Sequence, residues 1–130
     1  MIGLDTCTII DLFQGDKNLI KLIKSLDEEI CLSKTSYFEL IFGINPKNKK
    51  HIHEEKYYDE IFQNLKVFNL DLNSLKKSSR IFWEIKSKGK EIDRTDVLIA
   101  TSFKENNVNK IITKNKKHFS QIRGLDVIGY

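Results

Sequence analysis

Residues 93–101 constrain the fold of this chain more than any other stretch. They read Asp-Arg-Thr-Asp-Val-Leu-Ile-Ala-Thr, so a carboxylate stands at the start of a helix whose following face is apolar. Such a helix must be buried, and Asp96 is therefore expected at the edge of a core. The apolar run 111–113 follows and leads into a polar loop. A helix, a buried strand and a polar loop in this order form half of a parallel βαβ unit, in which ligands bind at the carboxyl ends of the strands.

The first residues show a similar arrangement. Segment 1–6 contains a short apolar strand that ends in an acid, Asp5, followed by Thr6. Asp5 and Asp96 are far apart in sequence, yet each stands at the rim of an apolar element. Because ligands collect at one edge of a parallel sheet, we expect both acids to belong to one site.

Strand and helix patterns alternate along the rest of the chain. The alternation predicts an α/β fold, a three-layer α/β/α domain with a central, mainly parallel five-stranded sheet. With 130 residues, the chain is expected to form a single domain over residues 1–130. The predicted strands are 2–5, 30–33, 67–70, 110–113 and 126–128.

The composition indicates a polyanionic partner. Lys and Arg number 22 against 18 Asp and Glu, which gives a net charge of +4. Because several of the acids are predicted to lie together in a site inside the fold, the outer surface carries a more positive charge than the net charge of the whole chain. This favours nucleic acid as a partner, with simple solubility as the alternative explanation. Lys47, Lys49, Lys50 and Lys114 are candidate contacts to the backbone of a nucleic acid.

The sequence predicts a cytoplasmic protein. No apolar run approaches the roughly 20 residues that a membrane helix needs. The N-terminus also lacks the basic and then apolar segments of a signal peptide. Cys7 and Cys31 both lie near predicted strands in apolar contexts, so we expect reduced core cysteines.

Four polar positions are predicted to lie together at one edge of the sheet. Asp5 and Asn115 end strands, whereas Glu39 and Asp96 begin helices that follow strands. Three carboxylates at one edge repel one another unless a cation lies between them. Oxygen donors of this kind, without a nearby Cys or His, favour Mg²⁺ or Mn²⁺.

Each of these positions also has a structural interpretation. Asp5 and Asn115 can cap the helix or turn that follows them. Glu39 completes the pattern Ser36-x-x-Glu39, which is typical of a capping box. Asp96 can be a first-turn acid that interacts favourably with the helix dipole, three residues behind an N-cap.

These motifs give the chain a resemblance to a known family. The residues that carry it are Leu4-Asp5-Thr6, Glu39-Leu40, Asp96-Val97-Leu98-Ile99-Ala100, Thr113-Lys114-Asn115 and Phe119. By these residues the chain resembles the PIN-domain ribonucleases, most closely the VapC-type toxins of bacterial and archaeal toxin–antitoxin modules, over nearly its whole length.

The resemblance implies roles for several of these residues. Asp5 and Asp96 would ligate the metal directly, and Glu39 would support it as the third catalytic carboxylate. Thr6 would help to orient Asp5, and Thr113 and Asn115 would support the site. The family pattern often has Asp in place of Asn115 and an acid in place of His118. The site therefore has three carboxylates, which argues against a tightly bound second metal.

The resemblance also implies a function. The chain would be a Mg²⁺- or Mn²⁺-dependent endoribonuclease, in which a metal-activated water cleaves RNA phosphodiester bonds. It would act as a toxin, form homodimers and pair with a small cognate antitoxin. The alternatives are a housekeeping PIN nuclease in RNA processing and a non-catalytic RNA-binding or scaffold module.

Overall fold

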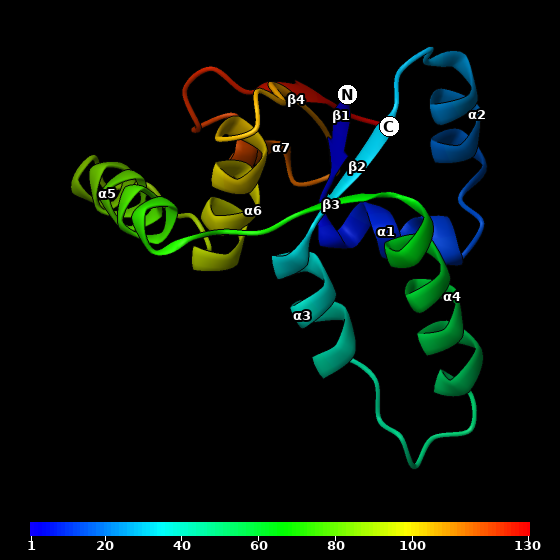
Figure 1. The fold of residues 1–130 in the computed structure, drawn as a ribbon. Helices are drawn as coiled ribbons and strands as arrows, with labels where there is room; N and C mark the ends of the chain where they lie inside the picture. The colour runs from blue at the N-terminus through cyan, green and yellow to red at the C-terminus, as the bar shows by residue number, and fades with distance from the viewer.

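A five-stranded sheet forms the centre of the structure, a computed structural model that describes residues 1–130 (Figure 1). All neighbouring strands are parallel, in the order β3-β2-β1-β4-β5. This confirms the predicted fold class, and every predicted strand is present within two residues of its expected bounds. The strands are β1 (Ile2–Leu4), β2 (Ile30–Ser33), β3 (Lys66–Phe68), β4 (Lys110–Ile112) and β5 (Asp126–Ile128).

Helices cover both faces of this sheet. They are α1 (Thr6–Phe13), α2 (Lys17–Ser25), α3 (Lys34–Phe42), α4 (His51–Asn64), α5 (Leu72–Ser87), α6 (Arg94–Lys104) and α7 (Lys116–Phe119). Because side chains alternate along a strand, Ile111 packs with the helices α5, α6 and α7, whereas Ile112 packs with α1 to α4. The two resulting cores confirm the three predicted layers.

Gly3 allows α6 to lie directly against the central strand. It pairs with Cys31 on one side and with Ile111 on the other. A Cβ atom at Gly3 would lie 2.3 Å from the ring of Phe103, which belongs to α6. Only a residue without a side chain fits there, so this contact fixes the spacing between the element that precedes Asp5 and the helix that carries Asp96.

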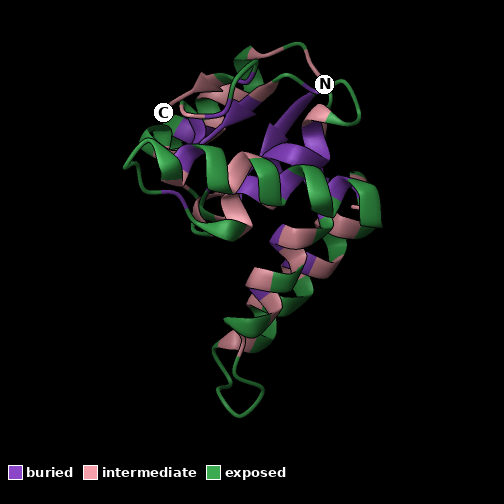
Figure 2. Cartoon of the chain, turned by 90° about the vertical axis from the view of Figure 1, so that its left-hand side faces the viewer, coloured by how far each residue is buried: buried purple, intermediate pink, exposed green.

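Helices α3 and α4 form an arm that extends away from the sheet (Figures 1 and 2). The arm is mostly exposed or half-buried, whereas the buried residues gather around the sheet (Figure 2). Tyr37 donates a hydrogen bond of 2.6 Å to Asp59 and so joins the two helices. The tip contains three of the candidate RNA-contacting residues, Lys47, Lys49 and Lys50.

Two local predictions are wrong. Helix α3 begins at Lys34, and its N-cap is Ser33, whose hydroxyl accepts from the Thr35 N–H. Ser36 lies inside the helix, so Ser36 and Glu39 form no capping box. Cys31 is buried as expected, but Cys7 is exposed because it lies on α1 at the open carboxyl edge of the sheet. No helix is long and apolar enough to cross a membrane.

Candidate metal centre

Asp5 is fixed at the carboxyl end of β1 by neutral hydrogen-bond donors. Its side chain is almost fully buried, with 2% of the residue exposed. Oδ1 accepts from the Thr8 N–H at 2.9 Å, and Oδ2 accepts from the Thr113 hydroxyl at 2.5 Å. Asp5 is thus the N-cap of α1 and a member of the site at the same time. The structure confirms the capping interpretation, and the role of Asp5 in a metal site stays a prediction.

Thr113 connects the two halves of the site. Its hydroxyl donates to Asp5 and accepts from the Asn115 N–H at 2.8 Å. The side chain is fully buried, and it directly follows β4, which pairs with β1. Thr113 therefore orients Asp5 and shapes the loop that carries Asn115.

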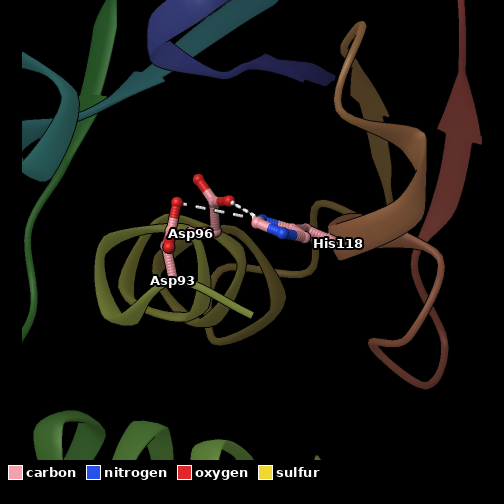
Figure 3. Close-up of side chains that lie close together, drawn as sticks. All are labelled: Asp93, Asp96 and His118. Atoms are coloured by element: carbon pink, nitrogen blue, oxygen red, sulfur yellow. Dashed lines mark hydrogen bonds and ion pairs between the residues drawn. The ribbon is translucent and has the colours of Figure 1, made fainter. Parts of the chain in front are cut away.

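Asp96 lies in the first turn of α6 and is held through one oxygen. Its Oδ2 atom accepts from the Asn115 amide at 2.9 Å and lies 2.7 Å from Nδ1 of His118 (Figure 3). Asp93 occupies the N-cap position without a side-chain capping bond, and its Oδ2 atom is 3.9 Å from the same nitrogen. Asp93, Asp96 and His118 each offer a potential ligand atom, and these atoms lie within 4.8 Å of one another.

Asn115 does not cap α7 with its side chain. The amide group turns to Asp96 instead, so it serves the site directly. For Asp93 the sequence favours the N-cap of α6, although its nearness to Asp96 also allows it to compensate for Asn115 at the site. A site role for His118 was not predicted, and its only signal was the position immediately before the buried Phe119, where the family pattern often has an acid.

Glu39 lies on α3 and is oriented by Thr6. The Thr6 hydroxyl donates to Oε1 of Glu39 at 2.6 Å. We expected Thr6 to orient Asp5, but its hydroxyl binds Glu39, since Asp5 already has Thr8 and Thr113 as donors. The first turn of α1 thereby links the two acids.

The electrostatics of the site reflect its buried carboxylates. Burial is the largest cause that raises the pKa of Asp5 and of Asp96 above the usual aspartate range. The pKa of the Cys7 thiol is raised to about 11, first by loss of solvent and then by the charges of Asp5, Asp96 and Glu39. The three predicted carboxylates therefore all lie close enough to Cys7, in the first turn of α1, to affect its thiol.

Lys114 differs from the other candidate RNA-contacting lysines. Its Nζ atom lies 2.7 Å from Asp11 and 3.5 Å from Asp16, and 5.0 Å above the ring of Tyr130. These contacts pair its charge within the protein and tie the loop after β4 to helix α1 and to the N-cap of α2. The lysines at the arm tip lie far along the chain from this network and outside the group of carboxylates.

The sequence matches the PIN domain family over residues 2–125. The chain belongs to the PIN domain family. An uncharacterised protein of Archaeoglobus fulgidus is 35% identical to this PIN domain over 92 residues, which are 71% of the chain and 96% of that relative. This confirms the resemblance that the motifs indicated.

Solved structures share the fold of this PIN domain. A chain of VapBC2 from Rickettsia felis, bound to a DNA fragment from their promoter, matches with a TM-score of 0.82 and 22% identity, covering 100% of this chain and 99% of that chain. A chain of a toxin–antitoxin complex from Klebsiella pneumoniae matches with a TM-score of 0.76 and 21% identity, covering 98% and 96%. At these identities the similarity establishes the fold.

Proposed function

We propose that this PIN domain is a divalent-metal-dependent endoribonuclease and the toxin of a toxin–antitoxin module. PIN domains are generally nucleases, which supports hydrolysis of nucleic acid as the reaction. The observation that carries the metal proposal is the buried Asp5 carboxylate, whose hydrogen-bond donors are all neutral. A buried charge without a cationic partner is costly, and a bound cation removes that cost.

The donor set fits Mg²⁺ or Mn²⁺. Oδ1 of Asp96 and Oε2 of Glu39 accept no hydrogen bond from the protein, and each Asp5 oxygen accepts only one. A carboxylate oxygen can accept two, so all three side chains retain free lone pairs. Hard divalent cations prefer such oxygen ligands, and Mg²⁺ is commonly held by one or two carboxylates together with substrate phosphates.

The residues of the chain would then position the reactants. An ion bound there would supply Lewis-acid polarisation of the phosphoryl group and a water nucleophile at neutral pH. Thr113 and Thr8 hold Asp5 in one rotamer, and Asn115 with His118 hold Asp96. The arm-tip lysines and the net charge of +4 favour approach of a polyanion such as RNA.

We expect purified protein to cleave single-stranded RNA with Mn²⁺ or Mg²⁺ and to lose this activity in excess EDTA. Adding back the ion should restore cleavage, because the carboxylates alone cannot stabilise charge on the leaving oxygen. The assay should follow a labelled RNA and a DNA oligonucleotide of the same sequence. Cleavage that persists in chelator would exclude the metal mechanism. Absence of cleavage with every ion would favour the RNA-binding or scaffold alternative.

The toxin role adds two partners, a small antitoxin and a second copy of the chain. It is supported by the shared fold with chains of toxin–antitoxin complexes. An apolar groove between α5 and α6 offers a surface for association. The groove is lined by Leu75, Phe82, Trp83, Val97 and Leu98, among others. Trp83 is 63% exposed in the isolated chain.

We expect a homodimer in solution and a tight complex with a small protein encoded next to this chain. Burial of exposed apolar side chains such as Trp83 favours both associations. Light scattering of the chain alone and after co-expression with the neighbouring gene product measures the assembly, and RNA cleavage by the complex should be lower. A strict monomer at all concentrations, both alone and with that product, would refute this part of the proposal.

A further inference from the structure

His118 and Asn115 both bind the same oxygen of Asp96. Nδ1 of His118 is 2.7 Å from Oδ2, the Asn115 amide nitrogen is 2.9 Å from Oδ2, and the two nitrogens are 2.9 Å apart. Phe119, the next residue, is fully buried and anchors α7 in the core. The imidazole is therefore held in place by the fold.

The protons of this group can be assigned from the distances. An ionised carboxylate has no proton, so a contact of 2.7 Å requires a proton on Nδ1 of His118. If the Asn115 amide were turned over, its carbonyl oxygen would face Oδ2, and two acceptors would repel. Both nitrogens therefore donate to Oδ2, and His118 has its proton on Nδ1 whether the ring is neutral or charged.

This arrangement leaves one oxygen of Asp96 free. Oδ2 accepts two hydrogen bonds, whereas Oδ1 accepts none from the protein. Figure 3 shows Oδ1 pointing away from the imidazole. When one oxygen of a carboxylate accepts hydrogen bonds from neighbouring residues, the other oxygen has a fixed direction in which to bind a cation. Such supporting hydrogen bonds strengthen metal binding.

We propose that His118 is a positioning residue that directs Oδ1 of Asp96 toward the cation and does not ligate the cation itself. The inference rests on the proposed metal-dependent function. The opposite assignment would make His118 a ligand together with Asp93 and Asp96, whose potential ligand atoms are close enough. Ligation through Nδ1 would require loss of its bond to Oδ2, and such a site would recruit Asp93, whose side chain is 74% exposed.

Two variants distinguish these roles. In His118→Asn the amide nitrogen occupies the place of Nδ1 and can still donate to Asp96. In His118→Gln the longer side chain places its amide near Nε2 instead. We expect His118→Asn to keep Mn²⁺ affinity within about threefold of wild type, and His118→Gln to lose about 10- to 100-fold, the range for supporting contacts to metal ligands.

Mn²⁺ affinity is measured by calorimetry without RNA, and circular dichroism checks that both variants are folded. Nitrogen NMR of the histidine rings is the second measurement. We expect it to show the proton of His118 on Nδ1 and no direct coordination of the ring to Mg²⁺ when this ion is added. Initial rates of RNA cleavage follow the same order as the affinities.

Three results would overturn the proposal. The first is that His118→Gln keeps its affinity for Mn²⁺ while His118→Asn loses it, and the second is that the two variants bind Mn²⁺ equally well. The third is an NMR spectrum that places the proton of His118 on Nε2 and none on Nδ1. A wild type that binds no divalent ion would also overturn it. A wild type that binds Mn²⁺ but does not cleave RNA refutes the nuclease function alone, since the affinity ratio of the variants still decides the role of His118.

Discussion

Asp96→Asn should reduce metal-dependent RNA cleavage by at least about a hundredfold while the fold is retained. The substitution removes one ligand charge, and a bound metal contributes several kcal/mol of charge stabilisation in the transition state. Asn keeps the shape of the side chain and can still accept from Asn115 and His118. Initial cleavage rates with Mn²⁺ measure the effect. A variant that cuts RNA at the wild-type rate would exclude Asp96 from the metal centre.

Asp96→Asn should also leave the stability of the metal-free protein unchanged or higher near neutral pH. Burial raises the pKa of Asp96, so the folded protein keeps this proton at pH values where the unfolded chain has released it. The contribution of Asp96 to stability therefore falls as pH rises from the usual aspartate range through the raised pKa. The difference in melting temperature between variant and wild type should widen over that interval.

Asp71→Asn provides a matched control. Asp71 is an exposed N-cap, and hydrogen bonds from Ser74 lower its pKa. The ionised Asp71 side chain stabilises the fold above its unfolded-state pKa, and this stabilisation is lost as pH falls through the lowered pKa of the folded state. The pH dependence is therefore opposite to that of Asp96. Because Asn is also a good N-cap, cleavage and melting temperature at neutral pH should hardly change.

Gly3→Ala should destabilise the fold by about 1–3 kcal/mol, the range for an extra methyl group in a packed core. The new Cβ atom would lie 2.3 Å from the Phe103 ring, and β1 cannot move away because it is paired on both sides. Urea unfolding measures the loss. Gly43→Ala is the control, since Gly43 is exposed and a Cβ there would approach no side chain, only the carbonyl oxygens of Leu40 at 3.3 Å and Glu39 at 3.8 Å.

The double variant Gly3→Ala, Phe103→Leu tests the cause. A smaller side chain at position 103 makes room for the methyl group, so the combined loss should be smaller than the sum of the single losses by about 0.5–3 kcal/mol. Strictly additive losses would show that the ring contact is not responsible.

Sequence patterns predicted the sheet well because each strand is a short apolar run between polar residues. They also placed Asp5, Thr113 and Asn115 at strand ends, where the structure has them. The capping box at Ser36 was wrong because Ser33 and Ser36 both suit an N-cap, and it is Ser33 that caps α3 in the structure. Local patterns treat capping and contacts at the sheet edge as alternatives, whereas Asp5 both caps α1 and accepts from Thr113.

The contacts around Asp96 could not be predicted in the same way. They depend on how closely α7 approaches α6, and His118 lies 22 residues from Asp96 in the chain. Sequence periodicity does not determine such a distance. The exposure of Cys7 was missed for a related reason, because an apolar sequence context does not reveal which edge of the sheet is left uncovered.

The order of the strands also determines when the contacts around Asp5 and Asp96 can form during synthesis of the chain. Asp5 is translated early, but its hydrogen-bond donor Thr113 follows 108 residues later. The donors to Asp96, which are Asn115 and His118, are also translated after it. The central strand β1 likewise lacks one neighbour until β4 exists. A growing chain therefore cannot bring Asp5, Asp96 and their hydrogen-bond donors together before residues 113–118 have been translated.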